Sequence, residues 1–579
     1  MKYIFIFFIL VVSSGAMTLR ADAYPDLKPV LDAQKGNAVI NIPKGTYLLD
    51  LQRYGAYTFD GLTGVEVKGN GSEIICNDQQ QAFSIKNCRN FKLSDISIDY
   101  DPLCFTQGVI TEIDPARKWF TITMDEGYPL ENITTERVQF FDPQTRTLRK
   151  NSITTYANNY TSLEKVSGAA FKLTKNGNWD ALEQLGDLVT LSVVSANKQI
   201  SHTIYLYRNT NLVMEDVTVY GSNSFSILEM ECNNSRYSRC KIIPKPDEPQ
   251  RPSPRLRSGN ADGLHSKQAL KGPTIENCEI TFCADDCIAI NGAFYPVYKV
   301  DNTNLDANCN SSDKTVRHIY LLGTNTSFKQ GAGDTLQLVS YDGALLGTAH
   351  IDFVRTQDDT EAPTPGEISA CMSKFPDLSN AGQYKYGVRY RISEIPEGVN
   401  INTGDLVYNK QGIGSGFAIR NNKIGYNRSR GILVKASDGI ITGNEITETA
   451  MNGIILSPEL NWMEAGCSEN VEISNNVLLN CMYERTNAGM RPGALAVVGI
   501  NGKREVSPAG MFHNITIRNN TIEGGPRPAI ALTSIDGVNG YDNLITPDEE
   551  MIREHGSRFG ADNTLDVWTK NVINAHLPE

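Results

Sequence analysis

Short β-branched segments joined by asparagine recur along most of this chain of 579 residues. Residues 211–219 and 440–446 are examples, in which apolar and polar residues alternate on either side of a bend. Such alternation is typical of strands, and asparagine tolerates the backbone of a bend. Asn444 follows Asn422 by 22 positions, and the pattern recurs with a period of about 22–30 residues. A repeat of that length predicts a solenoid, in which each turn of the chain stacks on the previous one.

The repeat favours a right-handed parallel β-helix, which is an all-β solenoid. The main alternative is a β-sandwich, but Asn-Gly hairpin signals are few in this chain. Helical periodicity is confined to short stretches such as residues 546–555. The chain is 40% hydrophobic, and a solenoid grows by adding coils, so its length does not require several separate cores.

Two long stretches, residues 101–200 and 325–410, interrupt the repeat. Each is long enough for a small antiparallel barrel, so we expect two inserted small β-barrel-like subdomains. A Pro/Arg-rich run at residues 244–257 is expected to form a loop that shapes a cleft. The expected divisions are a signal peptide (1–23), N-terminal coils (24–100), the first insertion (101–200), central coils (201–324), the second insertion (325–410), C-terminal coils (411–545) and a tail (546–579).

The N-terminus has the pattern of a secretory signal. Lys2 precedes an apolar run at residues 3–12, and residues 21–23 read Ala-Asp-Ala, which matches a cleavage site. The run is too short to span a bilayer, and no later stretch of about 20 apolar residues follows, so we expect an exported protein without membrane insertion. The formal net charge of −12 argues against nucleic acid as a partner and fits a neutral substrate.

Twelve cysteines are scattered along the chain. Several follow a turn residue at the start of a strand, as Cys240 and Cys278 do, and small side chains of this kind suit a solenoid interior. We expect most of them to be buried thiols. A zinc site at Cys283 and Cys287 is disfavoured, because their gap does not fit and no second Cys/His cluster accompanies them. The sequence therefore predicts no metal ion and no cofactor.

Three aspartates carry the strongest chemical signal. Asp262 lies in Ala-Asp-Gly-Leu-His265, and Asp285, 23 positions after it, begins Asp285-Asp286-Cys-Ile-Ala-Ile-Asn291. This spacing is about one coil of a β-helix, so the residues would stack about 4.8 Å apart. Clustered carboxylates repel, so at least one should hold a proton near neutral pH while others stay ionised. An acid beside a base is what hydrolysis of a glycosidic bond requires.

These motifs resemble those of β-helical inverting glycosidases such as the polygalacturonases. Across the mature chain the closer resemblance is to glycoside hydrolase family 110, bacterial exo-α-1,3-galactosidases that remove terminal galactose from blood-group-B-type glycans. It rests on residues 261–265, 272–278 and 285–292, and on the length, the N-terminus and the two insertions. The resemblance implies an exo-acting inverting α-1,3-galactosidase, periplasmic or secreted in a bacterium, whose substrate is a branched or linear glycan with terminal α-galactose.

The resemblance also implies roles for the aspartates. Asp285 would be the general acid that protonates the leaving oxygen. Asp262 and Asp286 would hold and deprotonate a water on the opposite face of the sugar. The acid and the base would then be separated by roughly 6.5–9.5 Å, which leaves room for that water and inverts the anomeric carbon.

Three further residues are candidates for binding substrate. His265 and Lys435 would donate hydrogen bonds to sugar hydroxyls, and Trp462 would stack on a sugar face. The alternatives are a structural hydrogen bond for His265 and packing within its loop for Trp462. The Gly-His-Gly and Arg-x-Lys strands with which polygalacturonases handle an acidic sugar are missing. A neutral sugar has no carboxylate for arginine to clamp, so their loss favours galactose over galacturonate.

Three other functions stay open: a polygalacturonase-like pectin hydrolase, a non-catalytic glycan-binding β-helix, and a polysaccharide lyase. A binding protein needs no triad of carboxylates, and a lyase usually needs Ca²⁺ or a basic residue beside an acidic sugar. Convergence of the three carboxylates in one place is therefore the observation that best separates an enzyme from a binding protein.

Overall fold

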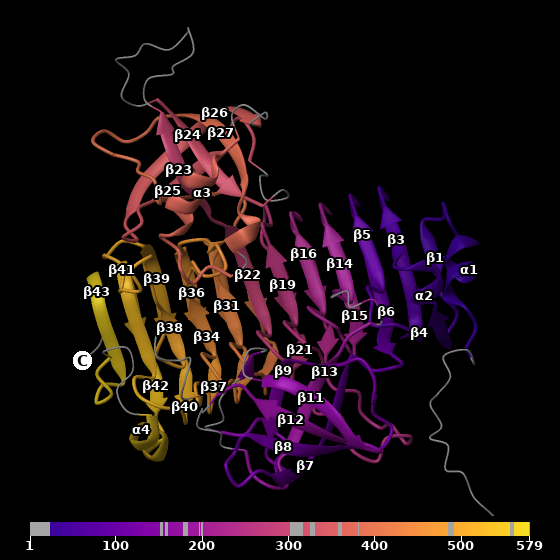
Figure 1. The fold of residues 1–579 in the computed structure, drawn as a ribbon. Helices are drawn as coiled ribbons and strands as arrows, with labels where there is room; N and C mark the ends of the chain where they lie inside the picture. Colours follow the sequence, from indigo (N-terminus) through magenta and orange to yellow (C-terminus); the bar gives the residue numbers. More distant parts are fainter. Residues whose placement is uncertain are drawn as a thin grey trace, which may run out of the picture.

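The computed structural model describes residues 24–150, 155–156, 160–177, 183–195, 197, 201–301, 316–324, 330–356, 362–379, 381–484, 491–555 and 561–577. The predicted signal peptide, residues 1–23, lies outside these ranges. Most of the described chain forms strands that stack along one axis (Figure 1). Strands of successive coils pair in parallel, as β14 (Ile204–Tyr207) does with β16 (Ile227–Met230). The predicted parallel β-helix is confirmed.

The parallel pairings run along three rows of strands. Row 1 contains β3 (Tyr57–Asp60), β5 (Phe83–Lys86), β14, β16, β19 (Leu264–Lys267), β22 (Ile288–Ala293), β31 (Ile432–Val434), β34 (Ile454–Leu456), β38 (Leu495–Val497) and the first parts of β41 (Ile530–Tyr541) and β43 (Val567–His576).

Row 2 contains β1 (Val39–Asn41), the first parts of β4 (Glu66–Cys76), β6 (Lys92–Tyr100) and β15 (Val213–Val219), then β17 (Arg236–Ser238), β20 (Thr274–Glu276), β29 (Ala418–Arg420), β32 (Gly439–Thr442), β36 (Glu469–Ser474), β39 (Phe512–Arg518) and the later parts of β41 and β43. Row 3 contains β2 (Thr46–Leu49), the later parts of β4, β6 and β15, then β18 (Lys241–Ile242), β21 (Glu279–Thr281), β30 (Lys423–Gly425), β33 (Glu445–Thr447), β37 (Val477–Leu479), β40 (Thr521–Glu523) and β42 (Leu544–Thr546).

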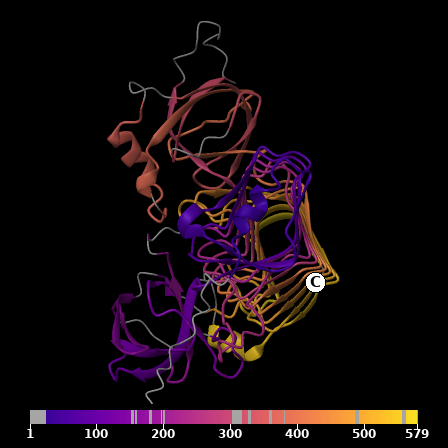
Figure 2. The ribbon, with the colours of Figure 1, turned by 90° about the vertical axis from the view of Figure 1, so that its right-hand side faces the viewer.

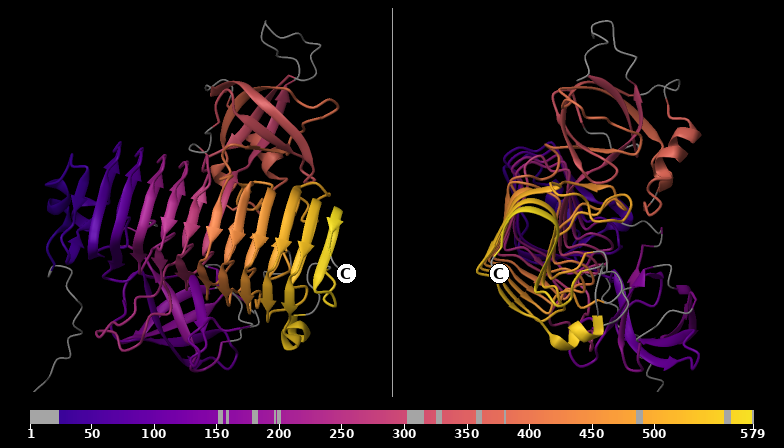
Figure 3. Two further views of the ribbon diagram at one scale, coloured as in Figure 1. Left: turned by 180° about the vertical axis from the view of Figure 1, so that it is seen from behind. Right: turned by 90° about the vertical axis from the view of Figure 1, so that its left-hand side faces the viewer.

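Two groups of antiparallel strands interrupt the coils. The first is a seven-stranded sheet of β7 (Phe105–Ile113), β8 (Trp119–Met124), β9 (Ile133–Phe141), β10 (Thr155–Tyr156), β11 (Tyr160–Ser167), β12 (Ala170–Lys175) and β13 (Leu188–Val193). The second is a closed barrel of β23 (Tyr295–Asp301), β24 (Arg317–Gly323), β25 (Thr335–Val339), β26 (Leu345–Thr356), β27 (Tyr386–Ser393) and β28 (Leu406–Asn409). The barrel lies at one edge of the coils and the sheet at the opposite edge, and in the end-on views both extend to the same side of the solenoid (Figures 2 and 3).

Helices are short and peripheral. In the described ranges they are α1 (Leu27–Asp32), α2 (Leu51–Tyr54), α3 (Pro365–Met372), α4 (Glu549–His555) and the 3₁₀ turn η3 (Ala381–Gln383). The barrel begins before the predicted second insertion at residues 325–410, because β23 follows β22 after one residue and leaves no break in the pattern. Near the C-terminus, β43 pairs in parallel with β41, so the solenoid continues into the predicted tail.

A ladder of buried asparagines ties the C-terminal coils together. The Asn444 side-chain oxygen accepts hydrogen bonds from the Asn422 backbone N–H at 3.0 Å and from the Asn422 side-chain amide at 2.9 Å. Asn476 accepts the same pair from Asn444, and Asn520 the same pair from Asn476. Each bend thus satisfies the polar groups of its neighbour, which explains why asparagine recurs with the period of the coil.

The described cysteines, Cys283 and Cys287 among them, are buried thiols that form no disulfide with one another. Small, weakly polar side chains of this type fill the solenoid interior without needing a strong hydrogen-bond partner. No helix in the described ranges combines the length and the apolar character needed to cross a membrane.

One carboxyl group lies inside the solenoid. Glu229, on the inward side of β16, is fully buried, and it accepts hydrogen bonds from Tyr237 Oη at 2.7 Å and Ser266 Oγ at 2.6 Å. Burial raises the pKa of the Glu229 carboxyl above its ordinary value, although the hydroxyls of Ser235, Ser266 and Tyr237 favour the ionised form. Ionisation at this position therefore costs folding energy.

We expect Glu229→Gln to gain stability relative to the wild type as the pH rises. A carboxyl group whose pKa is raised in the folded state contributes to the free energy of unfolding. That contribution is fully present below the pKa of glutamate in the unfolded chain and is lost as the pH rises through the folded-state pKa. The loss is about 1.4 kcal/mol for each tenfold difference in acid dissociation constant between the folded and unfolded states. Glutamine keeps the shape and cannot ionise.

Thermal unfolding at about pH 4, 6 and 8 measures the trend for Glu229→Gln, with the exposed Glu523→Gln as control. A stability difference between Glu229→Gln and the wild type that is constant with pH would contradict the prediction.

Candidate active site

The bends before β19 and β22 position the aspartates. The register of these two strands places Asp262 level with Asp286, each two positions before its strand. The Gly263 N–H donates to the Asp286 carbonyl over 2.9 Å, which joins the two bends. The coil at this point therefore holds 24 residues rather than the predicted 23, because the aspartate stacked on Asp262 is Asp286, and Asp285 lies just before it in the bend.

The structure brings the three carboxylates together. One oxygen from each of Asp262, Asp285 and Asp286 lies within 4.8 Å of the others. The side chains of Asp262 and Asp286 are 7% and 6% exposed, whereas that of Asp285 is 19% exposed. These oxygens lie closer together than the gap of roughly 6.5–9.5 Å expected between the acid and the base. Adjacent coils hold them at strand spacing instead.

Asp285 is held by two arginines. Arg428, between β30 and β31, donates from Nη2 to Asp285 Oδ2 over 2.8 Å. Arg137 of β9, in the first insertion, places its Nη2 3.7 Å from the same oxygen. Burial by itself would raise the pKa of Asp285, but the charges of Arg428, Arg137 and Arg430 outweigh it and lower that pKa below its ordinary value. Asp285 is therefore ionised at neutral pH in the free protein.

Asp286 has the opposite balance. The Arg430 backbone N–H donates to Asp286 Oδ1 over 2.8 Å, and Arg430 Nε lies 3.1 Å from the same oxygen. Burial nevertheless raises the pKa of Asp286 to about 7, because the charges of Asp262 and Asp285 add to it and Arg430 only partly offsets them. The two adjacent aspartates therefore differ in charge near neutral pH, which suits acid–base work.

Asp262 is paired with His265. Asp262 Oδ2 lies 2.7 Å from His265 Nδ1, and His265 Nε2 lies 2.7 Å from Asn291 Oδ1. Burial raises the pKa of Asp262, and the contact with His265 works in the other direction. Both ring nitrogens of His265 thus have partners within the protein, as the alternative of a structural hydrogen bond describes. The role of His265 in binding a sugar hydroxyl stays a prediction.

Lys435 is likewise engaged within the protein. Its fully buried side chain extends from the end of β31 and bonds Glu459 Oε2 at 3.0 Å and Glu464 Oε2 at 2.6 Å. Glu464 belongs to β35 (Glu464–Ala465), which folds back antiparallel on β22. Two carboxylates thus take two of the three donors of its ammonium group, and the predicted contact of Lys435 with substrate stays a prediction.

Trp462 lies in the turn between Glu459 and Glu464, and 49% of it is exposed. An indole exposed to this extent is available for a sugar to stack on. The turn that carries Trp462 is bonded to Lys435 through both of its glutamates. The stacking role of Trp462 stays a prediction.

Sequence reasoning missed the charged partners of the aspartates. Arg430 was within reach of that reasoning, because it precedes β31 at the position that Asp286 occupies before β22. Arg137 lies in an insertion, and Glu459 and Glu464 lie in a return loop, so no repeat marks them. The Arg-x-Lys strand is missing from the sequence, but arginines reach the aspartates from other segments. Their charge is offset, however, since Arg428 pairs with Asp285, and Arg430 pairs with Asp286 and, at 2.9 Å, with Glu459.

Carboxylates grouped this closely also occur in metal sites. Here each of the three already has a charged or hydrogen-bonding partner: Asp262 has His265, while Asp285 and Asp286 have arginines. Arginines at this distance would repel a divalent cation, so the cluster gives no separate reason to assign a metal ion.

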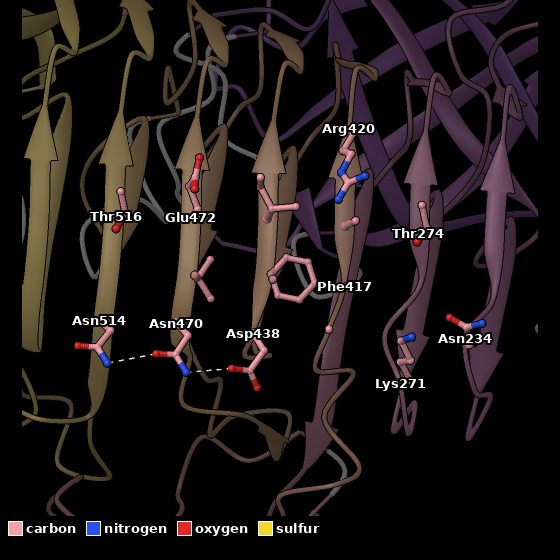
Figure 4. Close-up of a pocket in the computed structure, with 15 residues that line it drawn as sticks. Asn234, Lys271, Thr274, Phe417, Arg420, Asp438, Asn470, Glu472, Asn514 and Thr516 are labelled. Atoms are coloured by element: carbon pink, nitrogen blue, oxygen red, sulfur yellow. Dashed lines mark hydrogen bonds between the residues drawn. The ribbon is translucent and has the colours of Figure 1, made fainter.

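A broad surface hollow lies elsewhere. This shallow depression of about 580 Å³ crosses the outer side of row 2, from Asn234 to Asn514. Figure 4 shows Asn514, Asn470 and Asp438 joined there in a chain of hydrogen bonds of 3.1 and 2.9 Å. None of its lining residues belongs to the aspartate cluster. This chain of hydrogen bonds joins the bends of successive coils and is a structural feature. The size of a surface hollow therefore does not identify the candidate active site in this protein.

Comparison with known proteins gives relatives along most of the chain. α-1,3-Galactosidase B of Bacteroides thetaiotaomicron is 22% identical, over 96% of this chain and 88% of that protein. The α-1,3-galactosidase B of Parabacteroides distasonis is 23% identical, over 86% and 78%. α-1,3-Galactosidase A of Bacteroides thetaiotaomicron is 21% identical, over 84% and 78%.

Two solved structures also match, at low identity and low TM-score. The mannuronan C-5 epimerase AlgE4 A-module of Azotobacter vinelandii has a TM-score of 0.39 and 9% identity, covering 92% of this chain and 94% of that one. A polygalacturonase from Erwinia carotovora has a TM-score of 0.38 and 8% identity, covering 93% of each chain. A family model described as a right handed beta helix region matches residues 391–545. The chain is thus a right-handed β-helix protein that is similar, over most of its length, to curated α-1,3-galactosidases.

Proposed function

We propose that this protein is an exo-acting glycoside hydrolase that removes terminal α-1,3-linked galactose from glycans with inversion at the anomeric carbon. The observation that carries the proposal is the convergence of Asp262, Asp285 and Asp286, with neighbouring charges that separate their protonation states. A glycan-binding protein has no need of such a cluster. The names of the relatives supply the linkage and the sugar.

The exposures of the aspartates support the division of roles that the resemblance implies. Asp285 is the most exposed of the three, so it can reach the glycosidic oxygen where the rest of the glycan leaves the site. Asp262 and Asp286 lie deeper and stack on each other. A water held between them would approach the face of the sugar opposite the leaving oxygen. Asp285 is ionised in the free protein. As general acid it therefore takes the proton that Asp286 holds, since the protons of two coupled groups belong to the pair and not to either residue.

The short distance within the cluster bears on inversion. Two carboxyl groups about 5–5.5 Å apart are usual for retention, and wider gaps are usual for inversion. A third carboxylate changes this argument, since two of the three can hold the water while the remaining one acts as the acid. The proposal of inversion therefore rests on there being three carboxylates and on the resemblance, and the product anomer decides it.

We expect the protein to release β-galactose from a terminal α-1,3-digalactoside and to leave α-galacturonides intact. Proton NMR during the first minutes of reaction identifies the sugar, the linkage and the anomer in one measurement. A parallel reaction with a chelator tests the prediction that no metal is needed. Early α-galactose would contradict inversion, and activity restored by Ca²⁺ would favour a lyase or metal mechanism.

Asp262→Asn, Asp285→Asn and Asp286→Asn should each reduce hydrolysis of the digalactoside by at least about 10²–10⁴-fold, because the amide keeps the shape but cannot transfer a proton. An aryl α-galactoside with an activated leaving group needs no acid, so it should restore much of the activity of Asp285→Asn only. Asp438→Asn, in the hollow of Figure 4, is the matched control. Equal losses of Asp285→Asn on both substrates would show that Asp285 is not the acid.

We also propose that the protein is exported to the periplasm or secreted. Lys2, the apolar run at residues 3–12 and the Ala-Asp-Ala sequence at residues 21–23 support this. Expression of the full chain in a bacterium with a double membrane should give a periplasmic or secreted product that begins after Ala23. Mass spectrometry of the N-terminus measures this, and an uncleaved cytoplasmic product would contradict it.

A further inference from the structure

His265 is enclosed by groups that can only accept hydrogen bonds. It lies on the outward side of β19, 4% exposed, with Asp262 Oδ2 2.7 Å from Nδ1 and Asn291 Oδ1 2.7 Å from Nε2. The ring of Phe225 packs against the imidazole, with centroids 4.8 Å apart. Little of the ring is left for water to reach, so these two oxygens are its polar partners.

The orientation of Asn291 is set by its own backbone. Its side-chain nitrogen donates to the Gly292 carbonyl over 2.7 Å, which leaves the side-chain oxygen facing the imidazole. An amide oxygen accepts and cannot donate. Turning the amide over would place its oxygen against the Gly292 carbonyl and leave both unsatisfied. His265 Nε2 must therefore carry a hydrogen.

His265 Nδ1 also faces an oxygen and so also needs a hydrogen between the two atoms. With a hydrogen on Nε2, a neutral ring has a bare lone pair at Nδ1, and an ionised Asp262 would present a second lone pair to it at 2.7 Å. That contact is a hydrogen bond only if a proton lies between the two atoms. The pair therefore holds one proton more than a neutral histidine beside an ionised aspartate.

The surrounding charges favour this extra proton. Glu464 Oε1 lies 3.8 Å from His265 Nε2, and Asp285 and Asp286 lie beside Asp262. Opposing them are Lys267, 3.1 Å from Glu464, and Lys435, bonded to the other oxygen of Glu464. His202 stacks on the far side of Phe225. Carboxylates thus face the pair, and each of the two cations is itself paired: Lys267 with Glu464, and Lys435 with both Glu464 and Glu459.

We propose that Asp262 and His265 share one proton and act together, with His265 as the positioning residue that Asn291 orients. This inference deepens the proposed function and rests on it for its role in catalysis. The hydrogen bond that holds the shared proton occupies Asp262 Oδ2, so only Oδ1 is left to face the attacking water. In the reaction the water loses a proton to Oδ1 as its own oxygen bonds to the anomeric carbon, and the shared proton passes to His265 Nδ1. Asp262 then carries one proton, and His265 is doubly protonated. The glycosidic bond breaks, and the leaving oxygen takes the proton of the general acid.

The test reads the proton directly in the full-length protein without substrate. Nitrogen NMR of protein labelled at its seven histidines, with His265→Gln to assign the signal, should show His265 with a hydrogen on Nε2 and a strongly deshielded proton shared with Asp262. Asn291→Leu removes the acceptor of His265 Nε2, so the hydrogen should no longer be fixed on that nitrogen. This second variant keeps the test available if His265→Gln folds poorly. A ring with a bare Nε2, or without the shared proton, overturns the proposal.

Kinetics supply the second readout. Glutamine can donate to Asp262 but cannot store a proton, so His265→Gln should lower kcat by about 10²-fold, change KM little and move the pH profile. His513→Gln is the matched control, because His513 lies 4.0 Å from Asp536 in a partly exposed pair remote from the cluster. An unchanged pH profile with full activity would refute the catalytic part. If the wild type hydrolyses no α-galactoside, the proposed function fails while the NMR signals still decide the shared proton.

Discussion

The hydrogen-bonded stacking of one coil on the next is the constraint on which the rest of this protein depends. It sets the Gly263 N–H on the Asp286 carbonyl and so places Asp262 and Asp286, which are far from adjacent in sequence, side by side. Strand spacing leaves these carboxylates no freedom to separate. Their mutual repulsion is therefore built into the backbone, and neighbouring side chains have to compensate for it.

That compensation explains the density of charge around the cluster. Buried carboxylates without partners would cost several kcal/mol each, and here Arg428, Arg430 and Lys435 lie against Asp285, Asp286 and the pair Glu459–Glu464. The compensation is uneven. Asp285 has two arginines near one oxygen and is ionised, whereas burial and its neighbours raise the pKa of Asp286 to about 7. Unequal pairing therefore gives two adjacent carboxyl groups different charges near neutral pH.

Sequence reasoning reaches those parts of the molecule that obey the repeat. The parallel β-helix follows from alternation and from the asparagine bends, which the ladder through Asn444 and Asn476 explains. The three aspartates were found because they occupy equivalent bends. The partners were missed because Arg137 enters from an inserted sheet and Glu464 from a return loop, where no period applies. The partners of His265 and Lys435 within the protein were missed as well, because a sequence shows the donor but not the acceptor that it contacts.

The solenoid also explains why a coil of the candidate site differs from a purely structural coil in only a few side chains. Each coil presents the same backbone before its row 1 strand, and only the side chain at that position changes: His202, Phe225, Asp262, Asp286 and Arg430 follow one another along the axis. An aromatic pair at one end and an arginine at the other enclose two aspartates between them. The coils supply the carboxylates at fixed spacing, and the insertions and loops supply the charges that distinguish them. A change of chemistry on this fold therefore needs new side chains at one register position and a new neighbour outside the repeat, while the stacked core stays as it is.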